Sequence, residues 1–205
     1  MAVLVIDYGM GNLHSVQRAF EECGADVMVS DDPRSLKTAS HIVLPGVGAF
    51  PDAMRSIRKM GWYEAIRQEA FEEHIPLLGI CLGMQLLAEV GHEGGENEGL
   101  GLIPGEIRRL VPDCNESRLP HVGWNEVHQL APNPLLDGIP DGTDFYFVHS
   151  FHFIPADGSF AVGRTPYCGG FVSVVMNKKV YGVQFHPEKS QKSGFRVIHN
   201  FLAST

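Results

Sequence analysis

The sequence predicts an α/β fold with a central, mostly parallel sheet, helices on both faces and antiparallel strands added in the second half. In roughly the first ninety residues, short apolar runs alternate with stretches whose apolar residues recur at helical spacing. That alternation is typical of strand–helix–strand units around a parallel sheet. Between residues 105 and 184, β-rich segments follow one another with little helix between them, which indicates antiparallel neighbours in the same sheet.

The first strand is expected at Val3–Ile6, a continuous apolar run of the kind buried on both faces of a parallel sheet. A helix follows, and its apolar residues recur at helical spacing before Gly24: Leu13, Val16, Phe20 and Cys23. The next two strands are expected at Ala25–Val29 and His41–Leu44, with a short helix between them.

Two further helical stretches precede the fourth strand. The first carries Met54 and Ile57, and the second carries Ile66 and Ala70. The fourth strand is the apolar run Ile75–Leu78, which leads into a turn. The apolar positions of the helix expected behind this turn are Met84, Leu87 and Ala88.

The second half is expected to contain strands followed by one helix. The expected strands are Gly105–Leu110, Val122–Val127, Phe145–Val148, Ala161–Arg164, Phe171–Met176 and Val180–Gln184. An amphipathic helix is expected at Ser190–Leu202. The segment Glu93–Gly101 is rich in glycine and glutamate, and we expect it to be a mobile loop that borders the functional site.

Size and composition describe one globular domain spanning residues 1–205. Hydrophobic residues make up 44% and charged residues 20% of the chain, as in ordinary globular proteins. The formal net charge of −8 disfavours electrostatic binding to nucleic acid or to anionic membranes. The cysteines form no C-x-x-C pair, so neither a zinc site nor a disulfide framework is suggested; they are Cys23, Cys81, Cys114 and Cys168. Unpaired thiols, and an N-terminal apolar run too short for a secretion signal, predict a cytoplasmic protein.

The segment Gly79-Ile80-Cys81-Leu82-Gly83 predicts a sharp strand-to-helix turn with one thiol at its apex. Glycines at both ends leave room for such a turn, as in the G-x-S-x-G nucleophile elbow with sulfur in place of oxygen. A thiol at a helix N-terminus is favoured as the thiolate by the free N–H groups and the helix dipole. The alternative is a buried structural cysteine at the start of a helix.

A second motif, Gln184-Phe185-His186-Pro187-Glu188, ends another β-rich run and favours the catalytic interpretation. Pro187 holds His186 in an extended conformation, in which residues i and i+2 project to the same side. His186 and Glu188 then face one cleft, as a base and its orienting carboxylate must. The alternative is a solvated histidine beside a surface glutamate. Together with the cysteine turn, this motif predicts a triad of Cys81, His186 and Glu188.

An acyl-transfer cysteine also needs N–H donors for the oxyanion. One candidate is the backbone N–H of Leu82, and another is that of Val47 in the loop Pro45-Gly46-Val47-Gly48 after the third strand. Loops at the carboxyl ends of parallel strands line one crevice, and the flanking glycines let the Val47 amide approach a substrate or reorient. Gln85, one turn after Cys81, is placed to bind an amide. The alternatives are a simple tight turn for the loop and a partly exposed helix residue for Gln85.

The cysteine and histidine motifs together resemble those of the class I, triad-type glutamine amidotransferases, and this implies their flavodoxin-like glutaminase fold. Within that family, further segments resemble the glutaminase subunit of imidazole glycerol phosphate synthase: Asp7–Leu13, Leu44–Phe50, Pro120–Asn125 and Tyr146–Ser150, with Phe185–Ser190 also fitting. The resemblance runs from residue 4 to about residue 190 and departs at no catalytic position. Phe151, where tyrosine is expected to be frequent, is a mild difference.

The resemblance implies that the protein hydrolyses L-glutamine to glutamate and ammonia. Cys81 would attack the side-chain amide carbon, while His186, oriented by Glu188, removes the thiol proton and later protonates the departing ammonia. The amides of Val47 and Leu82 would stabilise the oxyanion, and water would hydrolyse the γ-glutamyl thioester. Carried over by position, the residues expected to hold glutamine are Gly46, Gly48, Gln85, Ser150 and Phe151, with Glu93 at its α-amine.

The resemblance also implies a partner. In this family ammonia passes to a synthase subunit, here a (β/α)8 barrel in a heterodimer, which makes imidazole glycerol phosphate and AICAR in histidine biosynthesis. Asn12, Trp124 and Tyr146 are the candidates for the partner-facing surface, and burial in the core is the alternative for the two aromatic residues. No metal or organic cofactor is implied.

A low glutaminase rate without the loaded partner is a further implication. If the Val47 amide points away from Cys81 at rest, the oxyanion hole lacks a donor, and losing one donor typically costs about 10²–10³ in rate. We therefore expect turnover to rise steeply when the partner and its ligand are present.

Three other functions remain open from the sequence. One is the glutaminase of another amidotransferase, such as anthranilate synthase, although the segments Leu44–Phe50 and Pro120–Asn125 argue against it. Another is a catalytically silent regulatory or scaffolding module, against which the intact triad speaks. The last is a free-standing cysteine hydrolase of γ-glutamyl compounds, which predicts full activity without a partner.

Overall fold

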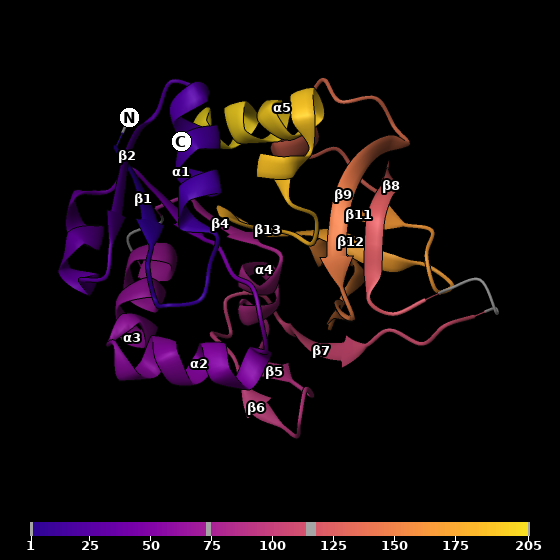
Figure 1. Ribbon diagram of the computed structural model, residues 1–205, viewed down its shortest axis with the longest axis horizontal. Helices are drawn as coiled ribbons and strands as arrows, with labels where there is room; N and C mark the ends of the chain where they lie inside the picture. The colour runs from indigo at the N-terminus through magenta and orange to yellow at the C-terminus, as the bar shows by residue number, and fades with distance from the viewer. Residues whose placement is uncertain (1, 73–74, 114–117, 205) are drawn as a thin grey trace.

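The computed structural model describes residues 2–72, 75–113 and 118–204, and it has the predicted α/β architecture (Figure 1). Of the cysteines named above, Cys114 lies outside the described residues.

The parallel part of the sheet joins the first four strands to β13, in the order β2-β1-β3-β4-β13. The bounds are β1 Ala2–Ile6, β2 Asp26–Ser30, β3 His41–Leu44, β4 Leu77–Ile80 and β13 Val180–Val183. Every residue of β3, β4 and β13 is buried. Because both faces of these strands are covered, their sequences are largely continuous apolar runs rather than alternating ones.

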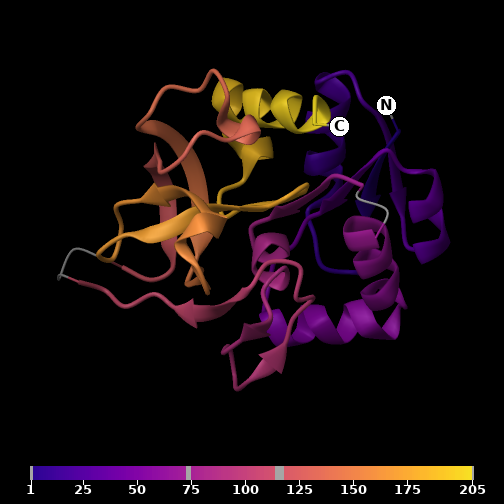
Figure 2. The same cartoon turned by 180° about the vertical axis from the view of Figure 1, so that it is seen from behind.

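Helices cover both faces of this sheet (Figures 1 and 2). One face carries α1 (Leu13–Glu22) and α5 (Gln191–Leu202), and the other carries α2 (Phe50–Lys59), α3 (Trp62–Arg67) and α4 (Leu82–Leu86). The side chains of β1 alternate between the two apolar layers: Val3 and Val5 pack with α1 and α5, and Leu4 and Ile6 with the other helices. The short helical turns are η1 Pro33–Thr38, the π-helical η2 Gln68–Glu72, η3 Pro134–Leu136, η4 Gly158–Phe160 and η5 Pro187–Lys189.

The second half adds antiparallel strands, as predicted. β12 pairs with β13, β10 pairs with β12 and β7, and β11 joins β12 to β8 and so to β9. The bounds are β7 Gly105–Arg109, β8 His121–Gln129, β9 Thr143–His149, β10 Phe151–Pro155, β11 Ala161–Thr165 and β12 Phe171–Asn177. We did not predict β10. It starts two residues after β9 ends, with no glycine or proline between them to mark a boundary.

The segment expected to be a mobile loop is tied to the sheet. Strands β5 (Val90–Gly91) and β6 (Asn97–Glu98) form a short antiparallel pair, and β5 lies parallel to β7. The Asn97 side chain donates to the carbonyl oxygens of Glu93 and Gly95. The segment thus contains a short strand and internal hydrogen bonds that its glycine-rich composition did not reveal, and Glu93 borders the functional site as expected. Its mobility stays a prediction.

The functional loops meet at one edge of the sheet. β3 ends at Leu44, just before the loop Pro45–Gly48, and the neighbouring β4 ends at Ile80, just before Cys81. Parallel strands bring their carboxyl ends to the same edge, which places this loop beside the cysteine. In the described part of the chain, no helix has the length and apolar character needed to cross a membrane.

Candidate active site

Cys81 occupies a strained turn between β4 and α4. Its backbone has φ 55° and ψ −109°, a conformation that few non-glycine residues adopt. A side chain at Gly83 would overlap the carbonyl oxygen of Leu44, and one at Gly79 would lie 2.7 Å from the carbonyl oxygen of Gly83. The turn therefore requires both glycines, because the helix backbone packs directly on the strands beneath it.

The sulfur of Cys81 is nearly buried and lies among polar groups. The residue is 5% exposed, its thiol faces the carbonyl oxygen of Val148 at 3.8 Å, and the Gln184 side chain donates to the sulfur at 3.7 Å. The helix behind it is shorter than predicted, since α4 ends at Leu86 and Leu87 already lies outside it. A helix of this length contributes only a small dipole, so the Gln184 side chain is the other group that donates toward the sulfur.

His186 and Glu188 form a buried pair. Nδ1 of His186 lies 2.7 Å from Oε1 of Glu188, and the two side chains are 3% and 2% exposed. His186 is extended, as Pro187 requires, but Glu188 lies in the 3-10 turn η5 and not in the extended segment we expected. The turn is closed by the N–H of Lys189 donating to the carbonyl oxygen of His186. This 3-10 turn, and not the extended segment that we predicted, brings the Glu188 carboxylate to the imidazole.

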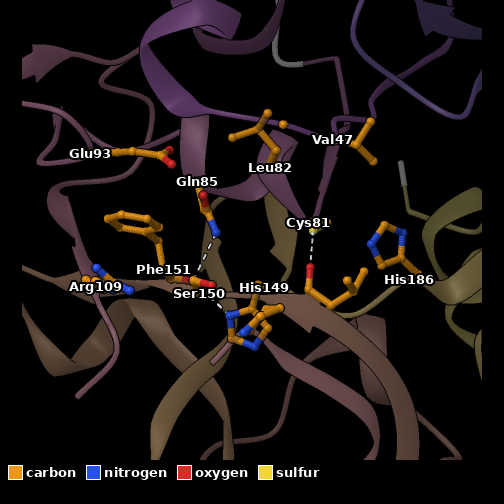
Figure 3. A pocket seen from close by; sticks show the side chains of 13 residues that line it. Val47, Cys81, Leu82, Gln85, Glu93, Arg109, His149, Ser150, Phe151 and His186 are labelled. Atoms are coloured by element: carbon orange, nitrogen blue, oxygen red, sulfur yellow. Dashed lines mark hydrogen bonds between the residues drawn. The ribbon is translucent and has the colours of Figure 1, made fainter. Parts of the chain in front are cut away.

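The imidazole of His186 faces Cys81. Both side chains line one pocket, and Figure 3 shows the ring beside the sulfur. Burial disfavours the protonated ring, but the proximity of Cys81 and Glu188 outweighs burial and raises the pKa of His186 to about 10. Nε2, the nitrogen that faces away from Glu188, has no hydrogen-bond partner among the described residues. Nε2 is therefore the nitrogen that takes up the thiol proton, and a pKa of about 10 means that the ring holds a proton there at neutral pH.

The two expected oxyanion donors differ in their resting orientation. Leu82 is the first residue of α4, where a backbone N–H has no partner within the helix. The N–H of Val47, in contrast, donates to the carbonyl oxygen of Met10 at 3.3 Å. Val47 must therefore exchange this bond for one to the substrate before it can serve as a donor. Glycines on both sides, including Gly48 at φ 105°, make such a rotation sterically possible.

Tyr8 lies behind this loop, an environment that we did not predict. Its hydroxyl is the atom nearest to a side chain placed at Gly46, and it has no hydrogen-bond partner among the described residues. Burial, with a smaller contribution from the charge of Cys81, raises the pKa of Tyr8. Gly46 packs against Tyr8 and Leu82 and is not among the residues that line the pocket, so its backbone role in holding substrate stays a prediction.

Gln85 is oriented by its own hydrogen bonds. Its amide nitrogen donates to the carbonyl oxygen of Phe151 and to the side-chain oxygen of Gln184, both at 3.0 Å. Both N–H groups are used, so Gln85 has only its oxygen left to accept a bond from a bound amide. It is also 5% exposed, which contradicts the alternative of a partly exposed helix residue.

Two neutral histidines form a hydrogen-bonded chain that ends on the carbonyl oxygen of Phe151. Nδ1 of His149 lies 2.8 Å from the carbonyl oxygen of Phe151, and its Nε2 lies 3.0 Å from Nδ1 of His121. A carbonyl can only accept, so His149 carries its proton on Nδ1, His121 donates to His149, and Asn125 donates to His121. Burial lowers the pKa of His121 to about 4 and that of His149 to about 3, so both rings are neutral. With Gln85 also bound, the Phe151 oxygen has no lone pair left for substrate.

The residues surround a cavity of about 540 Å³. The predicted site residues that line it are Val47, Gly48, Cys81, Leu82, Gln85, Glu93, Ser150, Phe151 and His186. Glu188 does not line it, because it lies behind His186. The residues that line it without having been predicted are Arg109, Pro120, Val148 and His149. His149 and Pro120 lay in segments already singled out by resemblance, whereas nothing in the sequence drew attention to Arg109.

The surface beside the pocket is apolar. Strands β8 and β9 pair so that Val122 lies opposite Val148 and Trp124 opposite Tyr146. Trp124 is 47% exposed, so the alternative of a core position is wrong for it, while Tyr146 is half-buried against its ring. Asn12, the third residue predicted for the partner surface, is exposed at the start of α1.

Comparison with known proteins agrees with this geometry. The family model described as "Glutamine amidotransferase class-I" matches residues 4–204. The chain is 48% identical to "Imidazole glycerol phosphate synthase subunit HisH" of Moorella thermoacetica, over 97% of this chain and 93% of that protein. It is 43% identical to subunit "HisH 1" of the same enzyme from Campylobacter jejuni, over 97% of this chain and 98% of that protein.

Solved structures show the same fold. A crystal structure described as a glutamine amidotransferase superimposes with a TM-score of 0.76 at 19% identity, covering 97% of this chain and 96% of that one. The structure of PurLQS from Thermotoga maritima superimposes with a TM-score of 0.75 at 20% identity, covering 98% and 97% of the two chains. The predicted flavodoxin-like glutaminase fold, with its mostly parallel sheet, is thereby confirmed.

Proposed function

The chain belongs to the class I glutamine amidotransferases, and we infer that it is the glutaminase subunit of an imidazole glycerol phosphate synthase, acting in histidine biosynthesis. The relatives named for this enzyme, at 43–48% identity over nearly the whole chain, favour it over the glutaminase of another amidotransferase.

The observation that carries this function is the buried ion pair of His186 and Glu188 facing a strained cysteine across one cavity. Cys81 attacks the amide carbon of glutamine, and His186 takes the thiol proton through Nε2. Glu188 holds the opposite nitrogen and stabilises the imidazolium. His186 then returns the proton to the departing ammonia, and water hydrolyses the γ-glutamyl thioester to glutamate.

Substrate binding in this scheme uses groups whose hydrogen bonds are not already taken. Gln85 accepts from the substrate amide through its oxygen, since its nitrogen is engaged. The backbones of Gly48 and Ser150 line the cavity and complete the binding surface. Glu93 supplies a carboxylate for the α-amine: its Oε2 accepts from the N–H of Phe50 at 2.7 Å, and no described residue donates to Oε1, which is left for substrate.

Regulation follows from the resting state of the oxyanion hole. Leu82 offers a donor at all times, but the N–H of Val47 is bound to Met10. Catalysis at full rate requires the Val47 peptide to rotate, which is the step that a loaded partner would favour. The missing donor corresponds to a rate lower by about 10²–10³ in the resting enzyme.

The partner in this proposal is a (β/α)8-barrel cyclase subunit, forming a heterodimer that passes ammonia directly from one site to the other. The apolar surface of Val122, Trp124 and Val148 supports a docking role, since exposed apolar groups next to a pocket are typical of interfaces. Val148 belongs both to this surface and to the cavity wall, so a docked subunit would cover the cavity mouth. Tyr146, whose ring packs against Trp124, extends this surface, and exposed Asn12 is proposed as a further contact with the partner.

The proposal treats residues 1–205 as one catalytic domain in the cytoplasm, without a metal or organic cofactor. It is supported by the family match across residues 4–204 and by a mechanism that uses only the chain's own side-chain and backbone groups and water.

The proposed function is tested by measuring glutamate release from L-glutamine by the chain alone, with the barrel subunit, and with the barrel subunit and its nucleotide substrate. We expect a low rate for the chain alone and a rise of about 10²–10³ in the loaded complex. The control is Cys81→Ala, which should abolish release in every condition. No release in the loaded wild-type complex would refute the function, and an equal rate without partner would indicate the free-standing hydrolase instead.

A further inference from the structure

The cavity has a charged end that the reaction scheme does not use in full. Figure 3 shows Glu93, Arg109 and Phe151 on the side of the cavity away from Cys81 and His186. One acidic and one basic side chain therefore lie where the part of the substrate remote from the amide must be. In the scheme above, only Glu93 has a role at this end.

Arg109 is directed to the cavity by strand pairing. It is the last residue of β7, and it lies directly opposite Phe151, the first residue of β10. Directly opposed residues of an antiparallel pair project to the same face of the sheet. The register is continued beyond the strand by the N–H of Leu110, which donates to the carbonyl oxygen of Ser150 at 2.9 Å. Arg109 therefore projects on the same face as Phe151.

The charge of Arg109 is not neutralised by any residue in the described part of the chain. No carboxylate of the described residues forms an ion pair with it, and it makes no hydrogen bond there. The preceding residue, Arg108, behaves differently, since its guanidinium binds Glu106 at 2.6 Å. Arg109 and Glu93 also form no ion pair with each other. The cavity thus presents one positive and one negative group, both available to a ligand.

We propose that Arg109 binds the α-carboxylate of the substrate, so that with Glu93 at the α-ammonium it makes the cavity selective for a free α-amino acid over other primary amides. A guanidinium matches a carboxylate through two parallel N–H···O bonds, which gives this contact both strength and direction. The assignment rests on the proposed function, because the γ-amide of glutamine must lie at Cys81 for its α-carboxylate to reach this end.

The test uses the loaded complex of this chain with its barrel subunit, and compares wild type, Arg109→Gln and Arg108→Gln. Three quantities are measured: KM and kcat for L-glutamine, and the inhibition constant of 4-aminobutanamide, which is glutamine without its carboxylate. For Arg109→Gln we expect KM to rise by about tenfold or more, kcat to change little and the inhibition constant to stay the same. Arg109→Lys should give an intermediate KM. Arg108→Gln, on the opposite face of β7, should match wild type.

The outcomes separate this assignment from the proposed function. An unchanged KM in Arg109→Gln would overturn the role of Arg109 while leaving the glutaminase activity established. Equal weakening of glutamine and 4-aminobutanamide would also overturn it, since the residue would then act on the fold of the cavity rather than on the carboxylate. Absence of glutamate release by the wild-type complex would instead refute the proposed function.

Discussion

Replacing Val47 by proline removes one N–H group from the active site and leaves Cys81, His186 and the Leu82 donor in place. In the structure this N–H is bound to Met10, so it reaches an oxyanion only after the peptide rotates. Proline has no N–H, so the rotated peptide would present no donor.

Two free energies set the expected size of the effect. Losing the hydrogen bond to Met10 costs the resting protein about 0.5–1.5 kcal/mol, which affects stability rather than chemistry. Losing one oxyanion donor costs the transition state about 2.7–4 kcal/mol, equivalent to about 10²–10³ in kcat. The second cost is the larger, so the substitution should raise the activation free energy of the loaded complex by more than it lowers the free energy of unfolding.

The assay is glutamate release by the complex at saturating barrel subunit and nucleotide substrate, with a thermal melt to confirm folding. The matched control is Val47→Ala, which keeps the N–H and shortens a side chain that is 43% exposed. The control should stay close to wild type while the proline variant loses about 10²–10³ in kcat. A proline variant as fast as the alanine variant would refute the assignment of Val47 as an oxyanion donor.

Gly83→Ala should lower both the melting temperature and the glutaminase rate, because the added methyl overlaps a strand carbonyl; Gly158→Ala, with open space around it, should change neither. Tyr8→Phe removes a buried hydroxyl without a partner in the described chain, so a differential melt should show a midpoint higher by about 2–4 °C, and a lower one would contradict this. Glu188→Gln tests the pKa of His186, about 10 when folded against an ordinary 6.5. A raised pKa stabilises the fold below pH 6.5 and loses that effect as the pH rises toward 10, so over this range the wild-type midpoint should fall more than the variant's. If the melting midpoints of the two proteins changed equally with pH, the result would count against the His186–Glu188 pair.

The parts of the site that the sequence predicted well are those determined by local backbone constraints. A strand that turns directly into a helix packed against it needs glycines where the two backbones meet. The spacing of Gly79 and Gly83 therefore identified the turn from the five residues 79–83 alone. Pro187 restricts the residue before it, which placed His186 correctly. We expected Glu188 to reach the imidazole along an extended segment, but it reaches it through a 3-10 turn. The motif does not specify this backbone conformation after Pro187.

The parts that could not be predicted depend on contacts between distant segments. The bond from Val47 to Met10 joins two loops, and no pattern within either loop specifies the direction of the amide. Arg109 lines the cavity only because of the register between β7 and β10, and β10 itself was missed. A shift of that register by one residue would direct Arg108 to the cavity instead, and the sequences of the two strands do not exclude it.

The most direct test of the central claim is the identity of the residue that carries the covalent intermediate. The loaded complex would be treated with a glutamine analogue bearing a diazoketone in place of the amide, digested, and analysed by mass spectrometry beside His186→Ala. We predict one adduct on the peptide containing Cys81, formed much more slowly in His186→Ala. Glutamate release that continues without modification of Cys81, or an adduct on Cys23 instead, would contradict the triad.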